Sequence, residues 1–153
     1  AAHIVDVEVD PDTGKVQILR YTALQDCGRA IHPSYVEGQI QGGAVQGIGQ
    51  ALMEDTVYDS STGQLLSASL MDYAMPRAEH APDFLFETRN VPCKTNPLGV
   101  KGAGEAGAIG SCPAIMNAIV DALWRSHRVR HVDMPATPRR VWEAIKTAQK
   151  PQI

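Results

Sequence analysis

A helical segment crowded with glycine constrains the fold of this chain more than any other feature. In "SYVEGQIQGGAVQGIGQALMED", residues 34–55, apolar side chains recur at the spacing of one helix face. The residues of this predicted face are Val36, Ile40, Ala44, Gly47, Ile48, Ala51 and Leu52. Five glycines between positions 38 and 49 weaken the helix by roughly 1 kcal/mol each relative to alanine. We therefore expect another backbone or a bound group to approach this helix closely.

Alternating apolar residues predict several stretches of β-structure. In residues 3–9, "HIVDVEV", valines alternate with acidic side chains, and after the turn "DPDTGK" the alternation resumes in residues 16–21, "VQILRY". These two strands predict a hairpin with one buried face. Residues 56–69 predict a second hairpin with its turn at Ser60 to Gly63, and residues 84–91, "FLFETRNV", predict a further strand.

A loop of about 20 residues follows the last predicted strand, and a loop of that length is uncommon in a compact domain unless it has a function. It is predicted to end at Pro113, because proline suits the first position of a helix, with Ser111 or Cys112 as the cap. The helix then covers residues 113–125. Its expected buried residues are Ile115, Ile119, Ala122 and Leu123.

Capping signals mark two other helices. Ser34 and Glu37 match a capping box at the start of the glycine-rich helix. Within residues 137–149, Thr137 is the expected cap and Pro138 the first residue of a last helix. The side chains expected to face inward from it are Val141, Trp142 and Ile145.

These elements predict an α/β (mixed α+β) fold, in which β-hairpins and a mixed sheet are packed by about three helices. A chain of 153 residues suits one domain, and 44% apolar with 20% charged residues is typical of a soluble globular protein. The net charge of -3 supplies no basic field, and the densest basic cluster is "RSHRVRH" at 125–131, so nucleic acid is disfavoured. No apolar run approaches the ~20 residues of a membrane span, which argues against a membrane.

No cysteine or histidine pattern predicts a metal site. Cys27, Cys93 and Cys112 are spaced too widely for a CxxC motif, and their odd number argues against a disulfide framework, which favours reduced thiols in a cytoplasm. His127 and His131 stand four residues apart without a third ligand, so we expect a basic surface cluster there. A helix dipole that lowered the thiol pKa of Cys112 would make it reactive, but a capping or buried thiol is favoured because no histidine accompanies it.

Residues 102–107, "GAGEAG", match the GxGxxG pattern that cradles a pyrophosphate at a helix N-terminus in dinucleotide-binding folds. That fold needs a strand directly before the glycines and a helix opening within them, whereas "KTNPLGVK" precedes them here and the predicted helix waits until Pro113. A plain flexible glycine loop is a second interpretation. In a third, the glycines let backbone N–H groups approach a bulky anionic or metal-bearing cofactor and hold Glu105 as a general base.

The glycine-rich helix also carries glutamines, whose amides both donate and accept hydrogen bonds and therefore suit the edge of a heterocycle. They are Gln39, Gln41, Gln46 and Gln50. Gln39 and Gln46 share a helix face because they lie seven residues apart, whereas Gln41 points elsewhere. The alternative is a packing seam of small residues with the glutamines on the solvent side.

Five ordered motifs resemble a known family. They are "DPDTGKV", "DCGRAIHP", "VEGQIQGGAVQGIGQAL", "SLMDYAMPRA" and "TNPLGVKGAGEAGAIGSCPAIMNAIVDAL". Together they resemble the C-terminal part of the molybdopterin-binding large subunit of the molybdenum hydroxylases, the family of xanthine dehydrogenase, aldehyde oxidase and aerobic carbon monoxide dehydrogenase. The resemblance runs from about residue 3 to residue 145, and the motif variants are most similar to the bacterial carbon monoxide dehydrogenase large chain.

The resemblance implies roles for individual residues. Glu105 matches the family's glutamate of the "GxGE" motif, which faces the molybdenum and accepts the proton of a metal-bound hydroxide that attacks an electrophilic carbon while hydride passes to a sulfido ligand. Gln39 matches the helix glutamine that hydrogen-bonds the pterin, and Asp26 in "DCG" is a further candidate for the dinucleotide end of the cofactor. The residues expected to line the same cofactor are Lys101, Gly102, Ala103 and Gly104.

The resemblance also implies molybdenum on a pterin cytosine dinucleotide, held without protein ligands to the metal, and an aldehyde, an N-heterocycle or a substrate of the carbon monoxide type. Iron–sulfur clusters and FAD are expected on partner subunits or domains of a cytoplasmic complex. Because the family's upstream cofactor and substrate segments are missing, residues 1–153 are expected to be the C-terminal portion of a longer domain. A catalytically silent structural or assembly fragment, and a nucleotide-binding module using Gly102 to Gly107, stay open as alternatives.

Overall fold

The computed structural model describes residues 1–148, and its centre is a three-stranded mixed sheet in the order β1-β2-β3. β1 (Ala2–Val9) pairs antiparallel with β2 (Val16–Gln25), and β2 pairs in parallel with β3 (Phe84–Thr88). The first predicted hairpin and the later strand are therefore confirmed. A bulge between Asp6 and Val7 interrupts the otherwise regular register of β1 and β2.

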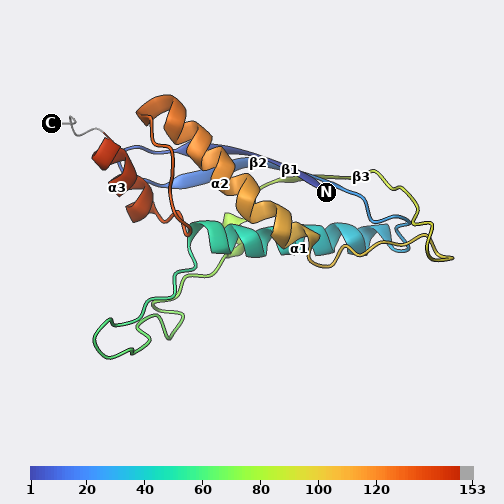
Figure 1. The fold of residues 1–153 in the computed structure, drawn as a ribbon, viewed down its shortest axis with the longest axis horizontal. Coiled ribbons are helices and arrows are strands. Elements are labelled where there is room, and N and C mark those ends of the chain that lie inside the picture. Colours follow the sequence, from blue (N-terminus) through green and yellow to red (C-terminus); the bar gives the residue numbers. More distant parts are fainter. Residues whose placement is uncertain (149–153) are drawn as a thin grey trace.

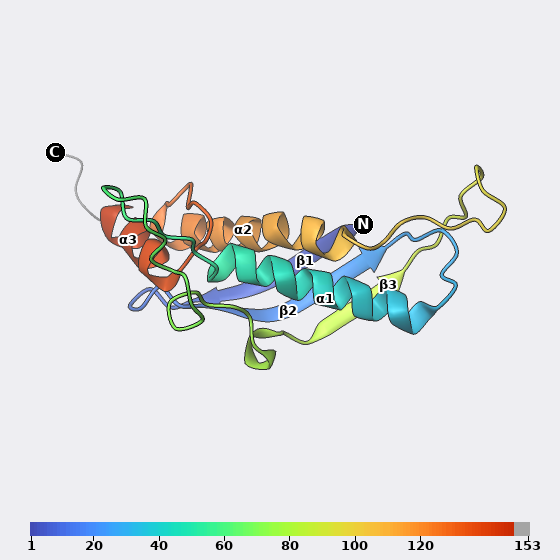
Figure 2. The ribbon, with the colours of Figure 1, turned by 90° about the horizontal axis from the view of Figure 1, so that it is seen from below.

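Three helices complete the predicted mixed fold (Figure 1). α1 (Pro33–Leu52) and α2 (Ala106–His127) lie side by side on one face of the sheet, and α3 (Pro138–Ala148) packs at the far end of α2 (Figure 2). A short 3-10 turn, η1 (Ala78–His80), precedes β3. The other face of the sheet exposes apolar side chains, among them Ile4, Leu19 and Leu85.

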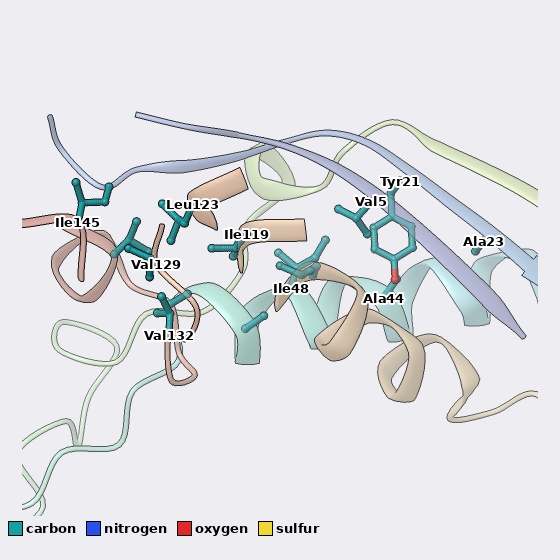
Figure 3. Packing of buried hydrophobic residues seen from close by; sticks show 14 of the residues in the cluster. Val5, Tyr21, Ala23, Ala44, Ile48, Ile119, Leu123, Val129, Val132 and Ile145 are labelled. Carbon is teal, nitrogen blue, oxygen red and sulfur yellow. The ribbon is translucent and has the colours of Figure 1, made fainter. Parts of the chain in front are cut away.

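The core lies between the sheet and the two long helices, as the alternation and the helical period predict (Figure 3). Tyr21 and Ala23 of β2 face the helices. The helical residues buried with them are Ile40, Ala44, Ile48 and Ala51 of α1 and Ile115, Ile119 and Leu123 of α2. Ile145 of α3 closes the same core at its other end. The predicted buried face of α1 is confirmed, with Val36 and Leu52 at its partly buried margins.

Close approach of α2 explains part of the glycine content of α1. A Cβ on Gly107 of α2 would lie 2.3 Å from the carbonyl oxygen of Ile40 and 2.8 Å from the amide nitrogen of Ala44. A Cβ on Gly47 would likewise meet the side chain of Ser111. The backbones of the two helices therefore touch along a seam of small residues. Gly42 is different, because a Cβ there would meet nothing within 4 Å.

The predicted capping box at Ser34 and Glu37 is wrong. α1 begins at Pro33, and His32 takes the N-cap position without a side-chain capping bond. Ser34 instead lies inside the first turn, where its hydroxyl pairs with His32 Nδ1 at 3.1 Å. Proline suits the first turn because its missing N–H would have no helical partner there, so the helix starts two residues earlier than the capping pattern implied.

α2 corrects the prediction that its helix would begin at Pro113. The helix begins at Ala106 and carries Pro113 in its interior, so neither Ser111 nor Cys112 is a cap. An interior proline costs about 3 kcal/mol because it removes one helical hydrogen bond. Packing of the earlier turns against α1, which buries Gly107 and Ser111, offsets that cost. Local propensity alone misses this contact.

With its full length of 22 residues, α2 also corrects the expectation that no segment approaches a membrane span. Its length and apolar composition would suit one. Ile115, Ile119 and Leu123 are nevertheless buried against other elements of this chain.

The second predicted hairpin reduces to a turn. Tyr58 and Leu65 form a single antiparallel bridge, and the N–H of Gly63 donates to the carbonyl of Asp59 at 2.9 Å. The Asp59 carboxylate accepts bonds from both Ser61 and Thr62, which stabilises the turn at the predicted place. The strands flanking it extend no further than that one bridge within residues 1–148.

The last helix confirms its predicted cap but not all of its predicted inner face. The N–H of Arg140 donates to Thr137 Oγ1 at 3.4 Å, and Val141 and Ile145 are buried. Trp142 is 38% exposed instead of facing inward, because it follows Val141 by one residue and lies about 100° around the helix. The predicted final residue, 149, lies outside the described residues.

Candidate cofactor site

Glu105 occupies the N-cap position of α2 with its side chain exposed. It makes no side-chain capping bond, although its backbone carbonyl accepts the N–H of Ile109 at 3.0 Å and so joins the helix. The backbone of Glu105 is therefore held by α2, while its exposed carboxylate makes no hydrogen bond to the N–H groups of the first helical turn. A carboxylate arranged in this way is free to act on a group outside this part of the chain.

Gln39 of α1 reaches the loop that precedes Glu105. Its Nε2 donates to the carbonyl oxygen of Gly104 at 2.7 Å, across 65 positions of sequence. Within residues 1–148 the amide oxygen of Gln39 accepts no hydrogen bond, so it is available to an outside donor. The structure thus brings together two residues that the sequence places in separate motifs.

Open backbone surrounds this contact. A Cβ added at Gly102 or Gly104 would meet no heavy atom within 4 Å, and the same holds for Gly38 and Gly42 on α1. Packing among the described residues therefore does not require glycine at these positions. Backbone exposed in this way, next to a free carboxylate and a free amide oxygen, fits a large ligand that approaches the main chain closely.

Lys101 and Asp26 form the polar start of the same loop. Lys101 Nζ lies 2.5 Å from Asp26 Oδ2, while Asp26 Oδ1 accepts the N–H groups of Gly28 at 2.9 Å and Val91 at 3.0 Å. The hydrogen bond from Lys101, followed by those two backbone donors, lowers the pKa of Asp26 to about 2. Asp26 is therefore ionised throughout the physiological pH range.

Sequence reasoning missed the residues that shape this loop. Asn96 closes it, because its side chain donates to the carbonyl of Val100 at 3.0 Å and accepts the Val100 N–H at 3.2 Å. Gly28 and Gly99 both adopt φ of +68°, and a Cβ on Gly28 would lie 2.2 Å from the Gly99 carbonyl oxygen. The Asn-Pro dipeptide that opens "NPLG", residues 96–99, is a sequence signal for such a turn. The segment after β2 and the segment after β3 consequently run together (Figure 1).

Two hollows of the chain do not include Glu105, and the smaller of them lies beside this loop. One of about 640 Å³ is lined by Arg29, Asn90 and Asn96 among others. A larger one of about 1170 Å³ lies between β2, the end of α1 and the segment around Arg77. Neither hollow includes Glu105 or Gln39, whose side chains are both exposed in this part of the chain.

Cys112 is a half-buried thiol and not a reactive one. Its Sγ donates to Gln50 Oε1 at 3.2 Å, and burial raises its pKa, which opposes thiolate formation. Because α2 begins at Ala106, Cys112 does not stand at a helix N-terminus. His127 and His131 pair separately, with Ser126 and Asp133, and residues 1–148 hold no cluster of three metal-ligating side chains.

The "GAGEAG" pattern partly meets the context that the dinucleotide interpretation requires. A helix does open within it, at Ala106, which corrects the expected delay to Pro113. The preceding strand, however, ends at Thr88, and a long loop separates it from Gly102. The strand, tight turn and helix of a dinucleotide-binding unit are therefore not formed here.

Comparisons with known proteins point in one direction. The family model described as "Molybdopterin cofactor-binding domain" matches residues 1–82. The chain is 42% identical over 144 residues to the nicotine 6-hydroxylase large subunit of Paenarthrobacter nicotinovorans. The aligned region covers 94% of this chain and 17% of that protein. The chain is 39% identical over 141 residues to the carbon monoxide dehydrogenase large chain of Hydrogenophaga pseudoflava, covering 92% and 17%.

A solved structure shows the same fold. Quinoline 2-oxidoreductase from Pseudomonas putida 86 superposes with a TM-score of 0.88 at 38% identity, over 95% of this chain and 18% of that one. The chain therefore spans less than a fifth of the length of the proteins it matches.

Proposed function

Because the chain belongs to the molybdopterin cofactor-binding domain family, we propose that it forms one wall of the active site of a molybdenum hydroxylase, with Glu105 as the catalytic base. One observation carries the proposal: the carboxylate of Glu105 is exposed and uncapped at the start of α2, beside Gln39 and a strip of open glycine backbone. Within residues 1–148 no internal contact accounts for that combination, and a bound molybdopterin would explain it.

The residues that would hold the cofactor are the amide of Gln39 and the loop Lys101, Gly102, Ala103 and Gly104. The free amide oxygen of Gln39 suits a pterin N–H, and the glycine positions let the main chain approach a bulky group. When bound, molybdopterin supplies the redox centre that takes two electrons from the substrate. We propose the cytosine dinucleotide form, with Asp26 near its dinucleotide end.

Glu105 would act as a general base on a water-derived oxygen nucleophile. Its carboxylate oxygen would accept the proton, and the start of α2 fixes the backbone that carries this side chain. The proposed substrates are aldehydes, N-heterocycles or carbon monoxide. We propose further that residues 1–153 belong to the C-terminal part of a longer subunit, which works in the cytoplasm with iron–sulfur and flavin partners.

Glu105→Gln in the complete enzyme tests the proposal. The amide keeps the size of the side chain but cannot accept the proton, so turnover should fall by at least ~100-fold while molybdenum content is unchanged. Metal analysis and steady-state kinetics measure both quantities. Glu8→Gln is the matched control, since Glu8 is an exposed carboxylate near the C-terminal end of β1, and it should retain wild-type turnover.

Two outcomes would contradict the proposal. Near-normal turnover of Glu105→Gln would show that another group is the base. A complete complex that contains no molybdenum would favour the structural or assembly role instead.

A further inference from the structure

Asp26 and Lys101 connect three segments that are distant in sequence. Asp26 ends the β2 region, Val91 follows β3, and Lys101 precedes the candidate base. The carboxylate of Asp26 accepts a bond from each segment: Lys101 Nζ on Oδ2, and the N–H groups of Gly28 and Val91 on Oδ1. Both of its oxygens are therefore already engaged inside the chain.

Lys101 is held at two points. Its ammonium group binds Asp26, and its backbone N–H donates to the carbonyl of Cys27 at 2.9 Å. Three residues separate Lys101 from Glu105, and two of them are glycines with free space around them. Glycine backbone of this kind rotates freely unless both of its ends are fixed. Gln39 fixes the far end through Gly104, so Lys101 is the anchor at the near end.

Resting on the function proposed above, we propose that Asp26 is a positioning residue, which fixes Lys101 and thereby the short glycine link that directs Glu105. The side chains of Asp26 and Lys101 are each 34% exposed, and an ion pair exposed to that degree adds little to global stability. The three hydrogen bonds that Asp26 accepts, from Gly28, Val91 and Lys101, instead restrict the backbone of the segments they connect. Asp26 thus acts on the base through the loop, without touching substrate.

Asp26→Asn in the complete enzyme breaks this link selectively. Asparagine keeps Oδ1 for the two backbone donors but replaces Oδ2 with an amide group that cannot bind an ammonium. We expect turnover to fall about 10-fold or more, because small misplacement of a catalytic group is costly, with KM unchanged within about twofold. Molybdenum content should remain at the wild-type level.

Hydrogen–deuterium exchange of the peptide that spans residues 100–106 gives a readout independent of activity. Its amides should exchange faster in Asp26→Asn and in Lys101→Met, and the double variant should lose no more turnover than either single variant, since both break one contact. Asp6→Asn is the control, because it removes the Asp6–Arg20 pair on the β1–β2 hairpin. It should leave turnover and exchange unchanged.

The outcomes separate the two proposals. If Glu105→Gln is inactive while Asp26→Asn shows wild-type turnover and exchange, the positioning role is overturned and the base assignment stands. If Asp26→Asn loses molybdenum, Asp26 acts on retention of the cofactor and its role in positioning Glu105 is likewise overturned. Wild-type turnover in Glu105→Gln overturns both proposals together.

Discussion

At the scale of single residues, the glycines of this chain fall into two physical classes. Gly107 stands where a Cβ would penetrate the backbone of α1, so helix packing requires glycine there. Gly42 lies on α1 in open space and only weakens the helix among the described residues. The glycines in the predicted helix indicated that another backbone or a bound group approaches it closely. They did not separate these two classes, because the neighbour of each glycine comes from a distant part of the sequence.

Alanine substitutions distinguish the two classes. Gly107→Ala should destabilise the chain by about 1–3 kcal/mol, because its Cβ would overlap the Ile40 carbonyl oxygen. Gly42→Ala should stabilise it by up to about 1 kcal/mol through helix propensity. Denaturant unfolding measures both differences. Equal effects of the two substitutions would contradict the proposed seam between α1 and α2.

Gln39 provides a second test at the residue scale. Gln39→Met removes the amide but keeps the length of the side chain, so it should weaken cofactor retention by about 5-fold, the order expected for one hydrogen bond. Molybdenum content of the complete enzyme after dialysis measures this. Gln46→Met is the control, since Gln46 is exposed further along α1, and its cofactor content should match that of the wild type. A similar loss in both variants would argue against a specific role for Gln39.

At the scale of elements, the start of α2 decides the geometry of the site. The proline pattern predicted a loop up to residue 112, and Glu105 in the middle of that loop. In the structure Glu105 is the N-cap of a 22-residue helix. The carboxylate is therefore carried at the N-cap position of a long helix instead of in the middle of a loop. Contact with α1 extends the helix past the proline.

The interior proline gives a prediction about stability. Pro113 is exposed, so Pro113→Ala should restore the missing helical bond to Ile109 without disturbing the core. The free energy of unfolding should rise by about 1–3 kcal/mol. Pro138→Ala provides the comparison, because Pro138 is the first residue of α3, where proline suits the helix, and it should give no such gain. Thermal unfolding distinguishes them, and a loss of stability in Pro113→Ala would contradict the expectation.

At the scale of the whole molecule, His3 joins the sheet to α2. Its Nδ1 lies 2.7 Å from the hydroxyl of Tyr21 on β2, and a Cβ on Gly110 of α2 would collide with its ring. Its Nε2 is buried and has no partner among the described residues. Burial lowers the pKa of His3 below its ordinary value of 6.5, so the folded chain favours the neutral ring.

The pH dependence of stability follows from that shift. As pH falls through 6.5, the unfolded chain binds a proton at His3 before the folded chain does, so stability decreases towards the lowered folded pKa. The unfolding midpoint should therefore drop more between about pH 7.5 and about pH 5 in the wild type than in His3→Gln, which keeps a polar partner for Tyr21. Identical pH profiles would show that His3 does not contribute.

The sequence by itself determined the elements whose pattern is local. The period-two valines of β1, the helical face of α1, the cap at Thr137 and the turn at Ser60 to Gly63 all depend on residues close in sequence. The order of the motifs likewise singled out Glu105 and Gln39 as candidate site residues. Only the tertiary structure decided where α2 begins, that β3 runs parallel to β2, and that Asp26 holds Lys101. Those features depend on contacts between distant segments. The free energy of these contacts overrides local propensity and cannot be inferred from any single stretch of sequence.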